Sequence, residues 1–453
     1  MIKRFNNKKM YYIMLLFIGI VAILFHVRMN LNYGDVVETY GLVLDPEKSG
    51  CYPKNGTVFG ALRNFVLNQY TGWSSRTIIE VVMVIISSFP NIVWHVLDIA
   101  ICIFIVAMLC KLLNIQNKKS ELLILLTCIA TYSVIDMSSA GWIATTMNYS
   151  WPLAMLLFLL VTIQKILKKE QIGKFEYLYS ILACIYSCNN EQITVFMTII
   201  SFSILLFESQ NKCFQRRLIP YFIITILEFL YIAISPGNAY RREFETNYWF
   251  PDYANYHLFD KIYLGYSTTI NNLFYSNNLI VLFFLVALMI NIWTKYSNGI
   301  IKIVSAIPVV FIVFVQYLSG HRLLNNYYVN LLKTPCYEGR IEQLTGIGYF
   351  SFGVSIILVV SVLISFWHAF VEDNLIIFMG VFIGSIASRL ILGFSASIYV
   401  SGYRTFLLLE ASLIFFSTYL IARNETAKKV FLDLKVFVIL FDIMLIFSNI
   451  IAV

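Results

Sequence analysis

The chain has 453 residues, of which 59% are hydrophobic and only 13% are charged. Soluble domains contain roughly 45–50% apolar and about 25% charged residues, so this composition excludes a water-soluble fold of such length. The net charge of +8 need not indicate nucleic acid binding, because lysine and arginine also orient membrane proteins and contact lipid headgroups. The composition predicts an all-α integral membrane protein, with residues 1–453 forming a single polytopic domain.

Apolar stretches long enough to cross a bilayer recur along the whole chain. A hydrocarbon core about 30 Å thick needs roughly 20 apolar residues per helix. This criterion predicts about thirteen transmembrane helices, within a range of 11 to 14, near residues 11–27, 90–112, 120–137, 151–167, 175–189, 192–207, 218–234, 278–294, 301–319, 347–367, 374–393, 404–421 and 430–451.

Residues 76–88 are apolar but too short to be another span. At about 1.5 Å per residue they cover only about 20 Å, and Pro90 ends them. We expect an interfacial helix there, following the first outer loop.

The basic residues predict the orientation of these spans. With a cytoplasmic N-terminus, most of the 33 lysines and arginines fall on short inner loops, as the positive-inside rule requires. The prediction is a protein of the bacterial cell membrane with its C-terminus outside. Its extracytoplasmic segments are then the first loop with its interfacial helix, residues 28–89, and two later loops, residues 235–277 and 320–346.

Two of the eight cysteines, Cys51 and Cys336, lie in predicted outer loops. The oxidising compartment permits a disulfide between them, and two unrelated thiols are the alternative. No CxxC pair or histidine cluster has the spacing of a metal site, so we expect neither a metal nor a cofactor.

Ionisable residues close to the hydrocarbon are functional candidates, because they are costly there. Asp35 and Glu38 follow the first span directly, and Asp35 comes after Gly34. Arg76 begins the interfacial helix, where a guanidinium and free backbone N–H groups together can hold a phosphate or can contact lipid headgroups.

Further candidates lie at the predicted outer ends of later spans. Asn148 and Tyr149 stand in an expected loop, GWIATTMNYSWP, just before a Trp-Pro pair. Asn190 and Glu191 lie in a tight predicted hairpin, where the carboxylate of Glu191 could pair with an arginine, bind a sugar hydroxyl or act as a base.

Arginines complete the candidate set. Arg241, adjacent to Arg242, follows a turn outside the seventh predicted span, and Arg404 enters the twelfth from outside. These acids, arginines and aromatic residues share one predicted side of the membrane. That distribution favours an outward-facing site for an anionic, amphipathic substrate, and we expect Arg76, Arg241 and Arg404 to converge in one pocket.

The order of the short motifs resembles a known pattern. Gly34-Asp35 with Glu38 is followed by WSSR (73–76), WxxTxxNYxWP (142–152), NNEQ (189–192), SPGNxxR (235–241) and YRTF (403–406). This series resembles a bacterial multi-pass membrane family of unknown function. That family is similar to O-antigen serotype-conversion glucosyltransferases and, remotely, to the GT-C glycosyltransferase superfamily.

The resemblance implies a GT-C-like fold and a sugar transferase that uses a polyprenyl-phosphate-linked donor and an extracytoplasmic cell-envelope glycan acceptor. It implies Asp35 as general base with Glu38 beside it, Arg76, Arg241 and Arg404 as phosphate ligands, and Asn190 and Glu191 as sugar contacts. The sequence departs from the superfamily in having Glu38 three residues after Asp35 instead of paired acids, which leaves open which carboxylate is the base.

Two other function classes fit a chain of this kind. A cell-surface polysaccharide polymerase or ligase also has many spans and arginine-bearing outer loops. A transporter of lipid-linked sugars would need ionisable residues along a path through the bilayer. Few ionisable residues lie deep inside the predicted spans, namely Asp98, Glu228, Asp442 and Arg389. They are too few to form such a path, which disfavours a transporter.

Overall fold

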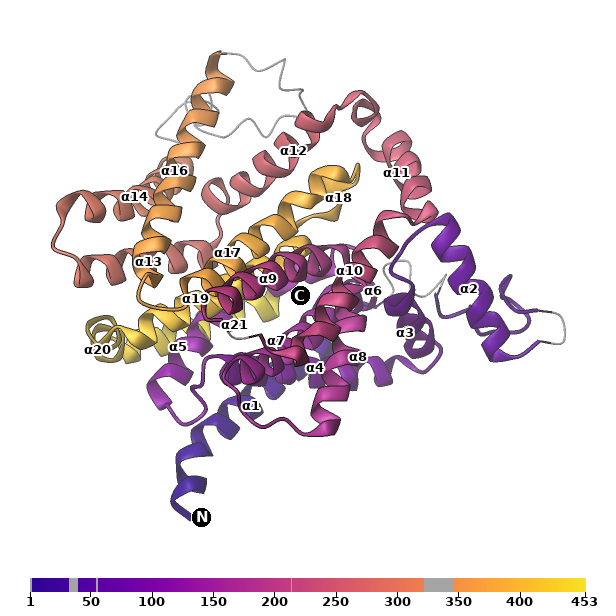
Figure 1. Ribbon diagram of the computed structural model, residues 1–453, viewed down its shortest axis with the longest axis horizontal. Coiled ribbons are helices and arrows are strands. Elements are labelled where there is room, and N and C mark those ends of the chain that lie inside the picture. The colour runs from indigo at the N-terminus through magenta and orange to yellow at the C-terminus, as the bar shows by residue number, and fades with distance from the viewer. Residues whose placement is uncertain (1, 32–39, 54–55, 213, 322–345) are drawn as a thin grey trace.

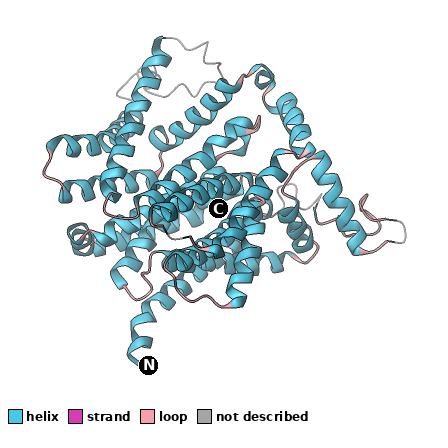
Figure 2. Cartoon of the chain, viewed as in Figure 1, coloured by secondary structure: helices cyan, strands magenta, loops and turns pink. Residues whose placement is uncertain are grey.

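The computed structural model describes residues 2–31, 40–53, 56–212, 214–321 and 346–453 (Figure 1). Within these ranges the chain is helical, and no β-strand occurs there (Figure 2). The α-helices are α1 (Ile2–Arg28), α2 (Val58–Gly72), α3 (Thr77–Ser87), α4 (Asn91–Leu112), α5 (Lys119–Ala130), α6 (Trp142–Thr145), α7 (Trp151–Leu167), α8 (Lys174–Cys188), α9 (Glu191–Gln210), α10 (Ile219–Ala233), α11 (Pro236–Trp249), α12 (Leu258–Ile270), α13 (Leu279–Lys295), α14 (Gly299–His321), α16 (Gly346–Phe370), α17 (Leu375–Leu390), α18 (Ile398–Ser401), α19 (Leu407–Arg423), α20 (Glu425–Asp433) and α21 (Lys435–Ala452).

Nine helices of the described chain are long and apolar enough to cross a membrane, and up to eleven if two bent helix pairs each count as one span. The expected number was about thirteen. The helix expected over 120–137 ends at Ala130, and the residues after it form a turn and the 3₁₀ helix Val134–Ser138. The helix expected over 175–189 is confirmed as α8 but has only 15 residues, below the length of a span.

The packing of the bundle follows from its composition. Phenylalanines of neighbouring helices stack in the interior, as Phe366 of α16 does on Phe382 of α17, with ring centroids 4.4 Å apart. Large apolar side chains also point outward, including Leu16, Phe202 and Phe437, which is 72% exposed. An exterior of this kind matches hydrocarbon better than water.

The short apolar helix expected over residues 76–88 is confirmed as α3 (Thr77–Ser87). The segments expected as loops differ from the prediction. Residues 235–277 form α11, the 3₁₀ helix Pro251–Asn255, α12 and the π-helix Asn271–Tyr275, and the first outer segment contains α2. Pro236 occupies the first turn of α11, where its missing N–H costs nothing. The expected loop 320–346 lies almost wholly outside the described residues, as does Cys336.

The segment GWIATTMNYSWP, also expected as a loop, is helical. It forms α6 and the π-helix Thr146–Ser150, which runs directly into α7. Single π-turns mark functional sites in many helices. This one ends at Ser150, two residues before Pro152, which cannot donate an N–H to the turn that precedes it.

Ion pairs gather where α7 and α19 end and α8 and α17 begin. Lys165 pairs with Glu176 at 2.5 Å, Lys295 pairs with Glu372 at 2.9 Å, and Arg423 pairs with Asp373. The other ends of α7, α9 and α19, where these helices begin, carry a different set of polar residues.

Candidate site at the starts of α3, α9 and α19

Four segments far apart in the sequence meet at this end of the bundle. They are the first turn of α3, the π-helix before α7, the first turn of α9 and the 3₁₀ helix Tyr403–Phe406 that leads into α19. Hydrogen bonds join them directly, as the following contacts show. Six of the residues expected in the site, Arg76, Asn148, Tyr149, Asn190, Glu191 and Arg404, lie in this cluster.

Arg76 and Glu191 form the central ion pair. Nε of Arg76 donates to Oε2 of Glu191 at 2.7 Å, and the two side chains are 13% and 24% exposed. The carboxylate of Glu191 holds the pKa of Arg76 above its ordinary value, against the opposing effect of burial. Of the roles open to Glu191 from the sequence, the structure therefore shows pairing with an arginine.

Asn148 and Tyr149 form one wall of the cluster. Nη1 of Arg76 donates to Oδ1 of Asn148 at 3.4 Å, and its guanidinium carbon lies 5.7 Å from the centre of the Tyr149 ring. The positive charges of Arg76 and Arg404 both interact electrostatically with the hydroxyl group of Tyr149. Tyr149 thus lies close to both guanidinium groups.

Arg404 is positioned by a polar neighbour and not by an acid. Its Nη1 donates to the hydroxyl of Ser139 at 2.8 Å. No carboxylate of the described residues lies within ion-pair distance of Arg404. Within the described part of the chain, the charge of Arg404 is therefore not neutralised by an acid.

Two successive asparagines build the turn that holds Glu191. The side chain of Asn190 caps α9 by accepting from Gln192 N and Ile193 N, and it donates to the carbonyl of Asn148 at 3.0 Å. Asn189, fully buried, reaches to α3 instead and accepts from Ile78 N at 3.0 Å and from Ile79 N at 3.2 Å.

A second contact fixes α3 from the side of α11. Asn238 bonds Ser75 twice, accepting from its N–H at 3.2 Å and donating to its hydroxyl at 3.0 Å. A Cβ at Gly237 would lie 2.7 Å from the carbonyl oxygen of Gln69 and 2.7 Å from the nitrogen of Trp73. The WSSR and SPGN motifs therefore pack backbone against backbone, which only glycine permits.

Arg241 lies on the flank of the cluster. It pairs with Glu245 of its own helix at 2.8 Å, and its guanidinium lies 5.6 Å from the Trp73 ring centre. Arg241 and Arg76 both lower the pKa of Glu80 through their positive charges. Glu80 therefore links Arg241 electrostatically to the rest of the cluster. Of the three arginines expected to converge in one pocket, Arg76 and Arg404 both lie near Tyr149, whereas Arg241 lies beside Trp73 and Glu245. Their convergence in one pocket stays a prediction.

Glu80 was not among the expected site residues. It lies one turn after Arg76 in α3, is 4% exposed, and its Oε2 has no hydrogen-bond partner in the described chain. Burial raises its pKa to about 7, although Ser74, Arg76 and Arg241 oppose the rise. The signal in the sequence was an acid inside an otherwise apolar helix, four residues after an arginine.

A buried chain of hydrogen bonds lies next to the cluster. Trp151 Nε1 donates to Asp98 at 2.7 Å, the other Asp98 oxygen lies 3.3 Å from His26 Nε2, and His26 Nδ1 lies 2.8 Å from His95 Nδ1. The chain ties the end of α1 to α4 and α7. Asp98 therefore has partners and is a helix–helix contact.

Asp35 and Glu38 lie outside the described residues. The residues that flank this segment, Leu31 and Tyr40, both pack on an apolar cluster built from α3, α4 and the α6–α7 region. Tyr149 packs on the same cluster. Leu31, Tyr40 and Tyr149 thus pack on one apolar cluster.

Searches against protein-family models, curated proteins and solved structures find no match for this chain.

Proposed function

We propose that the protein is a membrane glycosyltransferase of GT-C-like architecture, which moves a sugar from a polyprenyl-phosphate donor to a cell-envelope glycan acceptor outside the cell. The observation that carries the proposal is the cluster in which Arg76 and Arg404 both lie close to Tyr149 at the starts of apolar helices. The guanidinium of Arg404, which has no acidic partner among the described residues, lies beside amide and phenol groups at the end of an apolar bundle, and such a group suits a lipid phosphate joined to a sugar.

The proposed reaction needs a proton acceptor and a stabilised leaving group. A carboxylate, assigned to Asp35 with Glu38 as its neighbour, takes the proton of the acceptor hydroxyl. The hydroxyl oxygen then bonds to the anomeric carbon as the bond from that carbon to the phosphate oxygen breaks. The polyprenyl phosphate leaves with the electron pair, and fixed arginines offset its charge, an effect often worth several kcal/mol.

The binding half of the proposal is tested with the purified full-length chain. Polyprenyl phosphate should raise its thermal stability saturably, whereas the uncharged polyprenol should not. Arg404→Gln should weaken this binding about tenfold or more, whereas Arg63→Gln, an exposed arginine of α2, should not change it. Equal stabilisation by the alcohol and the phosphate would refute the anion site.

The chemical half is tested with membranes of a producing strain and a panel of radiolabelled polyprenyl-phosphate sugars. Asp35→Asn should lower transfer by about 10²-fold or more at normal membrane abundance, and Glu38→Gln should lower it less. If Asp35→Asn kept full transfer while Glu191→Gln or Glu80→Gln abolished it, the base would be that residue instead. Label incorporated by no member of the panel would count against the glycosyltransferase.

A further inference from the structure

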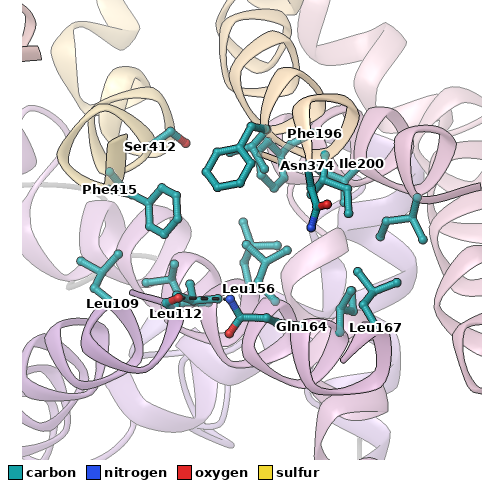
Figure 3. A pocket seen from close by; sticks show the side chains of 18 of the residues that line it. Leu109, Leu112, Leu156, Gln164, Leu167, Phe196, Ile200, Asn374, Ser412 and Phe415 are labelled. Atoms are coloured by element: carbon teal, nitrogen blue, oxygen red, sulfur yellow. Dashed lines mark hydrogen bonds between the residues drawn. The ribbon is translucent and has the colours of Figure 1, made fainter. Parts of the chain in front are cut away.

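A second feature lies inside the bundle, away from the candidate site. It is a cavity of about 240 Å³ between α4, α7, α9, α17 and α19, lined almost entirely by apolar side chains (Figure 3). An apolar cavity of roughly 150 Å³ already takes up benzene. This cavity is therefore large enough for a hydrocarbon group.

The cavity is elongated, and its lining is buried at one end and exposed at the other. On α7 its lining runs from Leu153 to Lys168, which at about 1.5 Å per residue is roughly 22 Å. Leu153 and Phe196 are buried, whereas Lys168 and Asn374 at the other end are exposed. The end with Lys168 and Asn374 is therefore an exposed opening of the cavity.

A layer of hydrogen bonds separates the cavity from the candidate site. One turn before Phe196, Gln192 donates through Nε2 to the carbonyls of Ser388 at 2.9 Å and Thr405 at 2.8 Å. These bonds tie the start of α9 to α17 and to the 3₁₀ helix that leads into α19. Gln192 therefore lies between the buried end of the cavity and the candidate site.

The opening carries positive charge. Lys168 belongs to the segment 165–174, which has four lysines and one glutamate. Lys165 is paired with Glu176, but no carboxylate of the described chain lies within ion-pair distance of Lys168. Gln164, whose amide donates to the carbonyl of Leu112 at 3.1 Å, also lines this end (Figure 3).

We propose that the cavity holds one acyl chain of an anionic phospholipid, with the phosphate of that lipid beside Lys168. The elongated, mostly apolar lining of the cavity suits a hydrocarbon chain, and the ammonium group of Lys168, which pairs with no carboxylate of the described residues, suits an anionic headgroup. The site is separate from the proposed donor site in ligand and in position. Such a lipid stays with the protein and fills the space between α7, α9 and α19, the helices that carry the candidate site.

The experiment uses the full chain in vesicles containing phosphatidylglycerol or phosphatidylcholine with a photoactivatable group at the end of one acyl chain. After irradiation, mass spectrometry of the peptides locates the label. Leu156 and Ile200, at 0% and 2% exposure, should be labelled as well as the outward-facing Phe202. Phosphatidylglycerol should label the buried pair at least fivefold more than phosphatidylcholine.

Matched variants distinguish labelling inside the cavity from labelling on the outer surface. Ala411→Phe fills the cavity and should abolish the buried label, whereas Ala100→Phe, on the exposed face of α4, should keep it. Lys168→Gln leaves the cavity intact and should remove the preference for phosphatidylglycerol, and Lys174→Gln should not. The two lysine variants decide the matter even if Ala411→Phe fails to fold.

Three results would overturn the proposal. They are label confined to outward-facing residues, an unchanged buried label in a folded Ala411→Phe protein, and equal labelling by the two lipids in the wild type. Displacement of the buried label by polyprenyl phosphate would instead assign the cavity to that lipid. None of these outcomes depends on whether sugar transfer is detected.

Discussion

Arg76 and Glu191 are 115 residues apart in the chain, and their side chains meet at 2.7 Å between Nε and Oε2. Arg76 also bonds Asn148, and Asn190, next to Glu191, bonds the backbone of the same residue. One ion pair and two hydrogen bonds therefore join the starts of α3 and α9 to each other and to the π-helix before α7. This arrangement has consequences for stability as well as for ligand binding.

Removing either member of the Arg76–Glu191 pair should destabilise the protein. Both side chains are mostly buried, so the partner left behind is a poorly solvated charge, and we expect a loss of about 2–4 kcal/mol. Thermal unfolding of Arg76→Gln and Glu191→Gln in detergent measures the loss. The double variant should lose less than the sum of the two, and strictly additive losses would contradict a direct interaction.

Replacement of Asn189 should loosen α3. Asn189→Leu leaves the N–H groups of Ile78 and Ile79 without their buried acceptor, at a cost of about 1–3 kcal/mol for each group left unpaired. Faster proteolysis near α3 and a lower unfolding temperature would both report it. Asn211→Leu, on the exposed end of α9, is the control. Equal stability of the two variants would count against the capping role.

Glu80 should make stability fall as pH rises. Burial raises its pKa to about 7 in the folded protein, above its ordinary value of 4.5, so the folded state binds the proton more tightly than the unfolded state. The free energy of unfolding should therefore decrease between about pH 5 and pH 8, by up to about 3 kcal/mol from this group.

Glu80→Gln should remove that part of the pH dependence, whereas the exposed Glu243→Gln should keep it. Unfolding measured in detergent at several pH values gives the comparison. The same slope in Glu80→Gln as in the wild type would show that Glu80 does not titrate in this range.

Gly237→Ala should separate α11 from the end of α2. The added methyl group would meet the backbone at Gln69, Trp73 and Ser74 at 2.7–2.8 Å, and none of these atoms can rotate away. We expect a loss of about 1–3 kcal/mol, or misfolding. Gly72→Ala, with open space at its Cβ, is the matched control and should be close to neutral in thermal unfolding.

The sequence allowed the general class of fold to be predicted, because apolar helices dominate its hydropathy. It did not allow the ends of the helices to be predicted well. Residues 235–277 look like a loop because they are polar, yet α11 buries Glu245 and Thr246 against its neighbours. Hydropathy also continues past Ala130, where the helix itself ends.

Candidate site residues were easiest to find where a charge stands beside apolar helix ends, as for Arg76, Glu191 and Arg404. Glu80 and Asn189 were missed for different reasons. Glu80 was missed because residues 76–88 were interpreted as an interfacial helix from their apolar side chains and their length. The direction of Asn189, toward α3 instead of its own helix, depends on packing between distant segments and cannot be read from NNEQ alone.

The meeting of the starts of α3, α9 and α19 has an electrostatic consequence beyond the arginines. The peptide dipoles of each helix leave a partial positive charge at its N-terminus, equivalent to roughly half a unit charge. Three such ends face one region, although the N–H groups of α3 and α9 are already bonded to Asn189 and Asn190. The backbone itself therefore gives this region a positive potential, which would persist in a protein that had lost both Arg76 and Arg404.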